Sequence, residues 1–386
     1  MLYYVPLESY PSRYTYQLTK WNTLTFDRLG VDYQIIQGDS TLARGGDIKV
    51  GQVLDVHNRT MFATSQIQSI VRLHEKGSLS DNDVLLFEDM YHPGLDALLY
   101  VFNAASPKYR PYVVMRCLAQ TIDPDDFVNR TETPHYKWMR HYERMAAQLT
   151  DLFLVGSEEM LPNLFISGFE DCKFSVTGLP FDSEEVRSHV SSIPAWGDRE
   201  NSVVFASRLD AEKQPDFYAR VALEVKARAL EVKFYVLAGK PASSNVPGMI
   251  DVLVAAGVTI LDNLPKSQYY ERLAKSRVLF NCALQDWYSN TISEADALGT
   301  NVVAPAYRSF PEALENDATR LYVPWSVDQA ADRILENLKK PSVNQGRISK
   351  YADRSIERSL LAINARQSKP LNSFNYREQL KHRRID

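Results

Sequence analysis

The most informative stretch of this chain reads Asp286-Trp287-Tyr288-Ser289-Asn290-Thr291-Ile292-Ser293-Glu294-Ala295-Asp296-Ala297-Leu298-Gly299-Thr300-Asn301-Val302-Val303. The order of residue types predicts a polar loop, a short helix, a glycine stop and a β-branched strand. Asp286 would precede the turn, and Glu294 would lie just inside the helix, so both carboxylates would face one pocket at the helix N-terminus. Such a terminus presents unpaired N–H groups that suit a phosphate, whereas a carboxylate there suits sugar or ribose hydroxyls.

The same window has a purely structural interpretation. Thr291 followed three positions later by Glu294 is a capping box, in which the two side chains satisfy backbone N–H groups at the start of a helix. Short motifs match by chance often enough that both interpretations stay open on this window alone.

A second element lies about eighty residues upstream. Residues 203–215 read Val-Val-Phe-Ala-Ser-Arg-Leu-Asp-Ala-Glu-Lys-Gln-Pro, a buried-type strand that runs into a polar turn. Arg208 and Lys213 follow the strand and precede a helix that begins near Pro215. Two basic residues in a loop are ordinarily solvated surface, but the order and spacing of the two elements together favour a shared anion site.

Together the two elements resemble the nucleotide-sugar site of retaining glycosyltransferases with the GT-B fold. That family has two glutamates eight positions apart, and Asp286 and Glu294 stand at those positions. It also has Gly-Arg-Leu-x-x-x-Lys-Gly after an earlier strand, where Ser207 and Gln214 replace the two glycines here. Asn301 replaces a proline that usually opens the last strand. The resemblance covers roughly residues 145–335.

The resemblance implies an α/β protein with the GT-B fold, two facing Rossmann-like domains and a C-terminal crossover helix. The first domain would span residues 1–182 and be completed by residues 346–386, and the second would span residues 183–345. The alternation of strand and helix patterns agrees with parallel sheets. In the first half we expect six strands: Leu2–Pro6, Tyr33–Gln37, Val84–Glu88, Tyr112–Arg116, Leu152–Val155 and Phe174–Val176.

The resemblance also implies roles for the second domain's polar residues. Arg208 and Lys213 would neutralise the donor diphosphate as it leaves, Asp286 would orient the sugar hydroxyls, and Glu294 would hold the nucleotide ribose. These four are the expected catalytic residues. The expected donor-binding residues are Arg208, Lys213, Gly239, Asn290, Thr291 and Glu294. The co-substrate would be a nucleotide sugar, with UDP as the expected nucleotide, and neither a cofactor nor a metal ion is required.

The acceptor is expected on loops that follow strands of the first domain, because ligands bind at the carboxyl ends of parallel strands. The candidate side chains are Arg13, His92, Gln120 and Asp123. For each of them an ordinary loop or capping role is at least as good an interpretation. For Asp123-Pro124-Asp125 we favour turn capping over a metal-binding Asp-x-Asp motif.

The composition is that of a globular protein, with 45% hydrophobic and 24% charged residues among 386. No run approaches the roughly 20 apolar residues of a membrane span, and the N-terminus has no signal-peptide pattern. Three widely spaced cysteines form neither a metal set nor a disulfide framework. The sequence therefore predicts a cytoplasmic protein.

The charge is uneven along the chain, whose formal net charge is −4. Residues 339–386 hold twelve Lys/Arg and four Asp/Glu, a net of +8, which suggests a polyanionic partner or a solvated helix face. The opening residues 4–15 resemble those of phage-encoded glycosyltransferases, some of which modify hydroxymethylated pyrimidines in DNA. DNA is therefore the expected acceptor, in the host cytoplasm if the chain is phage-encoded.

Other functions remain open at this point. The acceptor could be a polysaccharide or a small molecule. A nucleotide-sugar epimerase of the same fold would need an acid/base pair in the cleft and no separate acceptor. A non-catalytic binding protein would use the same donor residues without turnover.

Overall fold

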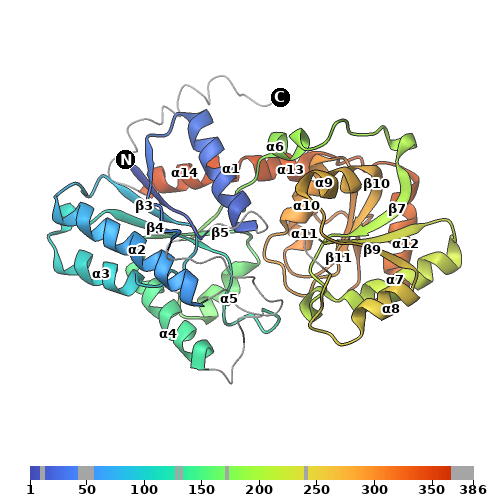
Figure 1. The fold of residues 1–386 in the computed structure, drawn as a ribbon, viewed down its shortest axis with the longest axis horizontal. Coiled ribbons are helices and arrows are strands. Elements are labelled where there is room, and N and C mark those ends of the chain that lie inside the picture. Colours follow the sequence, from blue (N-terminus) through green and yellow to red (C-terminus); the bar gives the residue numbers. More distant parts are fainter. Residues whose placement is uncertain are drawn as a thin grey trace.

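The structure is a computed structural model that describes residues 1–8, 14–41, 56–126, 129, 134–169, 174–238 and 242–366. It contains two six-stranded sheets, and every strand pair in both is parallel. Figure 1 shows them side by side, each covered by helices. All-parallel sheets need helices on both faces, and this explains why the central strands are continuously apolar.

The first sheet has the strand order β2-β1-β3-β4-β5-β6. Its strands are β1 (Leu2–Val5), β2 (Tyr33–Ile35), β3 (Val84–Phe87), β4 (Tyr112–Cys117), β5 (Leu152–Val155) and β6 (Phe174–Val176). The main helices around it are α1 (Tyr14–Leu29), α2 (Val56–Glu75), α3 (Leu95–Ala104), α4 (Pro134–Leu149) and α5 (Met160–Ile166). All six expected strands are present, with ends that differ by at most two residues.

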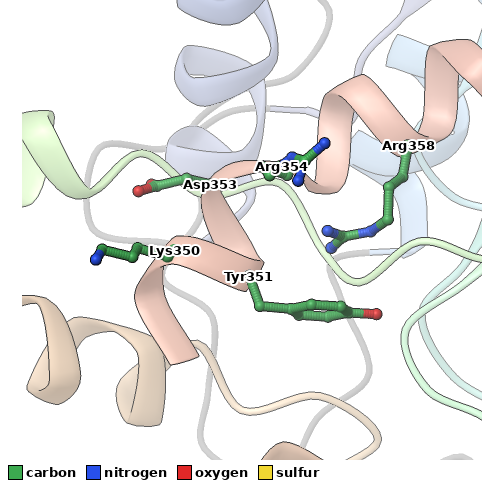
Figure 2. Close-up of a pocket in the computed structure, with 5 residues that line it drawn as sticks. All are labelled: Lys350, Tyr351, Asp353, Arg354 and Arg358. Atoms are coloured by element: carbon green, nitrogen blue, oxygen red, sulfur yellow. The ribbon is translucent and has the colours of Figure 1, made fainter. Parts of the chain in front are cut away.

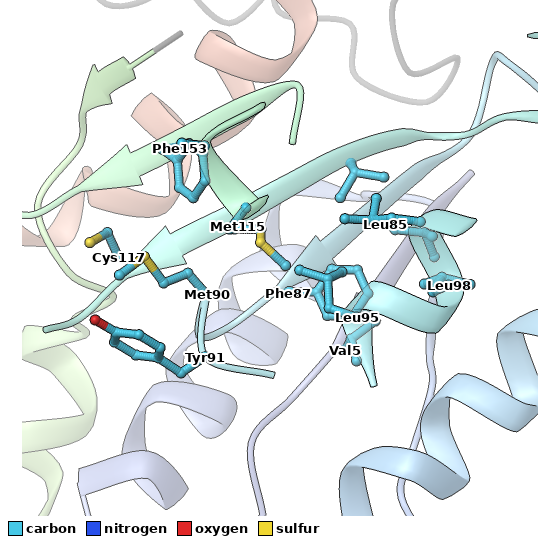
Figure 3. Close-up of a cluster of buried hydrophobic side chains, with 14 of the residues drawn as sticks. Val5, Leu85, Phe87, Met90, Tyr91, Leu95, Leu98, Met115, Cys117 and Phe153 are labelled. Atoms are coloured by element: carbon cyan, nitrogen blue, oxygen red, sulfur yellow. The ribbon is translucent and has the colours of Figure 1, made fainter. Parts of the chain in front are cut away.

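The hydrophobic core of this first half consists of side chains from both faces of its sheet, because successive residues of a strand point to opposite faces. Leu85 and Phe87 of β3 pack with Met115 of β4 and with Leu95 and Leu98 of α3, as Figure 3 shows. All five side chains are essentially inaccessible to solvent. Fully burying side chains of this size is worth roughly 1.5–3 kcal/mol each, so this layer fixes α3 against the sheet.

The second sheet has the order β12-β11-β10-β7-β8-β9. Its strands are β7 (Glu200–Phe205), β8 (Lys233–Leu237), β9 (Val258–Leu261), β10 (Ser276–Phe280), β11 (Asn301–Pro305) and β12 (Leu321–Tyr322). Its helices are α7 (Pro215–Arg228), α8 (Met249–Ala255), α9 (Lys266–Lys275), α10 (Asn290–Ala297), α11 (Phe310–Ala313) and α12 (Val327–Lys339). The chain order reverses between β7 and β10, and ligands bind parallel α/β sheets beyond such a point.

The chain passes from one sheet to the other twice. It first crosses near α6 (Ser183–Ser188) and returns through α13 (Arg347–Asp353) and α14 (Ser355–Arg366). Apolar side chains of α13 belong to the same core cluster as α10, whereas those of α14 pack beneath the first sheet with residues of β1, β3 and β5. The predicted GT-B arrangement of two facing sheets with a C-terminal crossover helix is therefore confirmed (Figure 1).

The C-terminal crossover is made of two helices. It breaks at Arg354, which separates α13 from α14 (Figure 2). We propose residues 1–182 and 183–345 as the two domains, and the return of the chain begins after residue 345. None of the helices in the described ranges combines the length and apolar character needed to cross a bilayer.

Candidate functional site

The site is built first around Glu294 on α10. Its carboxylate is 4% exposed and accepts hydrogen bonds from the hydroxyls of Tyr269 and Tyr270, each at 2.9 Å. Lys266 Nζ lies 3.5 Å from the same carboxylate. Burial, reinforced by the charge of Glu294, raises the pKa of both tyrosines, which therefore stay protonated and donate.

The contacts at the start of α10 test the capping-box interpretation of the Thr291–Glu294 spacing. The helix begins at Asn290 with Ser289 as its N-cap, and no side chain caps it by a hydrogen bond. The capping box is therefore not formed, and Thr291 instead shares a hydrogen bond of 3.0 Å with the Ser289 hydroxyl. An ionised carboxylate has about four acceptor positions, so Glu294 keeps capacity beyond the two tyrosines.

The loop before α10 follows the carboxyl end of β10. Asp286 is half-buried, and its backbone carbonyl accepts a hydrogen bond of 2.6 Å from the Ser309 hydroxyl. Within the described residues no partner is recorded for its carboxylate. Asn290 Oδ1 is likewise buried without a hydrogen-bond partner there. The loop thus offers a carboxylate and an amide oxygen with acceptor capacity to spare.

The basic turn after β7 is tied directly to this loop. Lys213 Nζ donates to the carbonyl of Gln285, and the N–H of Leu284 donates to the carbonyl of Glu212 at 2.8 Å. Arg208 lies half-exposed and pairs with Asp210 at 2.8 Å and with Glu212 at 2.7 Å. The fold therefore brings Lys213 to the loop that carries Asp286, whereas Arg208 forms these ion pairs within its own turn.

Gln214 stands where the resembling family has glycine, and the backbone shows the consequence. Its φ is 52°, in the left-handed region that costs a non-glycine residue about 1 kcal/mol or more. The side chain offsets this cost. Gln214 Nε2 donates to the carbonyl of Cys282 at 2.6 Å, and Gln214 Oε1 accepts from the Trp325 indole at 2.9 Å.

The two halves meet at Arg308, a residue that no sequence motif indicated. This residue follows β11, and its guanidinium lies 2.8 Å from both the Asp123 and Asp125 carboxylates and 3.6 Å from Glu159. Its Nε donates to the carbonyl of Leu284 at 3.2 Å. A polar side chain directly after a strand was the available signal, but only the facing carboxylates of the first half show its role.

Two carboxyl groups of this ion cluster have a raised pKa. Burial raises the pKa of Glu159 to about 7, against the favourable charge of Arg308. Burial also raises the pKa of Asp123. Asp123 accepts from the backbone N–H of Asp125 at 3.0 Å, so it caps its turn as well as joining the two halves.

The other acceptor-side candidates make their recorded contacts within the first half. His92 is buried next to Gln66, with Nε2 2.9 Å from Gln66 Oε1, and burial lowers its pKa to about 3. It is therefore neutral. Gln120 is fully buried, and its Nε2 lies 3.4 Å from the carbonyl of Met160.

Arg13 and Gly239 lie outside the described residues, as does the basic end of the chain from residue 367 onward. Trp287 was not expected at the interface. It belongs to the core cluster of the first half, although it precedes α10 of the second. The Asp286 loop thus touches both halves.

Comparisons with known proteins agree with this arrangement. Residues 200–340 match the family model described as Glycosyl transferases group 1. No curated protein matches the chain. The sucrose-phosphate synthase of Thermosynechococcus elongatus aligns with a TM-score of 0.64 at 9% identity over 99% of both chains.

Two further solved structures hold a uridine nucleotide. The trehalose-6-phosphate structure from E. coli, bound with UDP-2-fluoro glucose, aligns with a TM-score of 0.60 at 12% identity over 96% of this chain and 99% of that one. TarM of S. aureus, in a complex that includes UDP, aligns with a TM-score of 0.50 at 14% identity. The alignment covers 81% of this chain and 58% of TarM. At these identities the likeness shows the fold.

Proposed function

We propose that this glycosyltransferase transfers a sugar from a UDP-sugar donor to a hydroxyl acceptor with retention of the anomeric configuration. The observation that carries the proposal is the link between the Lys213 turn and the Asp286 loop beside α10. The link brings the Lys213 ammonium to the loop that carries the Asp286 carboxylate and precedes the N-terminus of α10, at the carboxyl ends of β7 and β10. The UDP and the UDP-2-fluoro glucose bound in the complexes of two proteins with this fold support the choice of nucleotide.

Each group has a chemical role in this proposal. Positive charge from Arg208 and Lys213, together with the N–H groups at the start of α10, would stabilise the diphosphate as its bond to the sugar breaks. Asp286 would orient the sugar hydroxyls, and Glu294 would accept from the ribose hydroxyls. No side chain need act as nucleophile, and no metal ion is needed where these cations supply the charge.

The donor assignment is tested at Glu294. We expect Glu294→Gln to weaken UDP binding roughly tenfold or more, because a hydrogen bond to a charged group contributes about 1.5–3 kcal/mol. Glutamine keeps an oxygen that can accept from one of the two tyrosines, so the fold should survive. Titration calorimetry with UDP measures the effect, and a thermal melt checks the fold.

Glu271→Gln is the matched control, because it removes a partly exposed carboxylate from α9, the helix that carries Tyr269, where Glu271 pairs only with Lys275 among the ion pairs of the described residues. UDP affinity should be unchanged in that variant. If a folded Glu294→Gln protein binds UDP as the wild type does, Glu294 is a structural anchor for α9 and the donor assignment fails.

For the acceptor we propose a hydroxymethylated pyrimidine base in DNA. The support is the net charge of +8 over residues 339–386 and the phage-like opening of the chain. A base in a duplex must be flipped out to reach a cleft, and contacts to the phosphate backbone must hold the strand meanwhile. Because such contacts release counterions, DNA affinity should fall as salt rises.

The acceptor test compares sugar transfer to hydroxymethylated DNA, unmodified DNA, a polysaccharide and small alcohols, detected by mass spectrometry. We expect transfer to hydroxymethylated DNA alone. Deleting residues 381–386 removes three Lys/Arg and should lower DNA affinity and flatten its salt dependence, while hydrolysis of the donor continues. Transfer only to a glycan or an alcohol would overturn the DNA proposal and leave the donor site intact. Epimerisation of the sugar without transfer would replace transfer by the epimerase function.

A further inference from the structure

The loop after β11 holds the backbone of the Asp286 loop, which runs from β10 to α10. Arg308 Nε donates to the carbonyl of Leu284 at 3.2 Å, and the Ser309 hydroxyl donates to the carbonyl of Asp286 at 2.6 Å. The Arg308 guanidinium also lies over the Trp287 ring, 5.3 Å from the ring centre. Two successive residues of the second half therefore hold Asp286 and its neighbours on either side.

The first half binds the same guanidinium. Nη2 donates to Asp123 Oδ1 and to Asp125 Oδ2, both at 2.8 Å, and Nη1 lies 3.6 Å from Glu159 Oε1. Since Nε is bound to the Leu284 carbonyl, each of the three guanidinium nitrogens has a protein partner. Arg308 is thus a cation beside the donor site whose contacts are those of a residue that holds protein groups in place, not those of a ligand for the diphosphate.

The backbone of Arg308 agrees with this role. Its φ of 53° is in the left-handed region, which is unfavourable for a residue with a side chain. Such a conformation persists where the surrounding contacts over-determine it, and it is found most often where function requires a fixed geometry. The side chain is only 9% exposed, and its contacts with both halves supply that constraint.

A second hydrogen bond follows the same path between the halves. Gln285 Nε2 donates to Asp126 Oδ2 at 3.2 Å, and the carbonyl of Gln285 accepts from Lys213 Nζ. The turn at residues 123–126 therefore contacts the second half through both Arg308 and Gln285. A shift of this turn relative to the second sheet would displace Gln285 and, with it, the adjoining Asp286.

We propose that Arg308 is a positioning residue that sets the Asp286 loop in register with the turn at residues 123–126 of the first half. Asp286 reaches the sugar hydroxyls only while that turn holds the guanidinium, so the first half controls the rate of transfer from the donor bound to the second. The inference rests on the proposed function, because it takes Asp286 as the group that orients the sugar. Arg308 itself touches neither donor nor acceptor.

The test uses Asp125→Asn, because Asp125 belongs to the first half and has no recorded contact with the Asp286 loop in the part of the chain that the structure describes. In steady-state kinetics with UDP-glucose we expect kcat to fall roughly fivefold or more, the lower bound usual for coupling between separate sites. UDP affinity, measured by calorimetry, should be unchanged, since UDP has no sugar for Asp286 to hold. This split separates the effect from a loss of folded protein, which a thermal melt checks.

Two further variants show whether the effect passes through Arg308. Glu158→Gln is the matched control, because it removes an exposed carboxylate beside Glu159, and kcat should be unchanged in it. In an Arg308→Gln background, Asp125→Asn should have no additional effect on kcat, since the ion pair that it removes is already absent. The proposal is overturned if Asp125→Asn lowers kcat equally in both backgrounds, or does not lower it at all.

A spectroscopic reporter makes the test independent of sugar transfer and of the folding of Arg308→Gln. The full chain labelled with fluorotryptophan carries five fluorine labels, and the Trp287 resonance is identified by its loss in Trp287→Phe. We expect this resonance to shift in Asp125→Asn and to stay in place in Glu158→Gln. If the wild type releases no UDP from any UDP-sugar, the proposed function fails, and the shift still decides the positioning role. An unshifted Trp287 resonance in a folded Asp125→Asn protein would overturn the inference.

Discussion

Replacing Lys213 by alanine is expected to lower kcat by roughly 10²–10³-fold, the loss typical when one electrostatic donor is removed from a developing charge. Lys213 lies where the turn after β7 meets the Asp286 loop, and its ammonium is held there by the Gln285 carbonyl. The charge would be needed most as the diphosphate departs, so KM for the donor should change less than kcat. Steady-state kinetics with UDP-glucose, scored by release of UDP, measures this.

Two controls sharpen that experiment. Lys233→Ala removes an exposed lysine from β8 that pairs with Glu200, and it should leave kcat unchanged. EDTA should also leave the wild-type rate unchanged, since Arg208 and Lys213 supply the positive charge in the proposed mechanism. A strict requirement for a divalent ion would contradict that mechanism, as would a Lys213→Ala enzyme with wild-type kcat.

Replacing Arg308 by leucine is expected to destabilise the protein by about 3–5 kcal/mol, the cost of removing one partner from a buried ion pair. The Arg308 and Asp123 side chains are only 9% and 1% exposed, so the carboxylate would be left buried without its counter-ion. Chemical denaturation measures the loss. Adding Asp123→Asn to Arg308→Leu should restore part of it. A loss under about 1 kcal/mol would mean that the Arg308–Asp123 pair contributes no more to stability than an ordinary surface salt bridge does.

The same cluster predicts a pH dependence of stability. Because the pKa of Glu159 is raised to about 7 from an ordinary value near 4.5, the folded protein binds this proton more tightly than the unfolded chain does. The resulting stabilisation is fully present below pH 4.5 and is lost as the pH rises through about 7. The difference in unfolding free energy between Glu159→Gln and the wild type should therefore change across this window.

Glu158→Gln provides the control for that measurement, since Glu158 is the exposed neighbour of Glu159. Taking the difference in unfolding free energy between variant and wild type cancels the contributions of other titrating groups, including those that change stability in the opposite direction. One such group is buried His92, whose lowered pKa makes stability rise with pH between about 3 and 6.5. A difference profile that is flat from pH 4.5 to 7 would contradict the assignment of this titration to Glu159.

Local sequence patterns determined most of the strands of this protein. Strands β1, β3 and β5 are short apolar runs that are buried throughout, a pattern that burial of both sheet faces requires. The local pattern does not predict α2, because two of the positions that the fold buries in it hold Arg and Gln. The side chains of Arg59 and Gln66 can be buried because they donate hydrogen bonds to groups far away in the sequence, among them the carbonyls of Tyr91 and Ile36. Such partners are invisible to a local pattern.

The sequence by itself determined the alternation of strands and helices and the order of the donor-side elements, because strand period, turn residues and motif spacing are local properties; the GT-B arrangement of two facing sheets was what the family resemblance implied. It also placed Arg208 and Lys213 after one strand and Asp286 after another. Only the tertiary structure decided that Glu294 binds two tyrosines rather than capping its helix, that Arg308 joins the halves through Asp123, and that the same guanidinium holds the Asp286 loop through the Leu284 carbonyl. These are contacts between segments far apart in the chain. They depend on how two sheets pack, and hydrogen-bond partners and burial exist only after that packing.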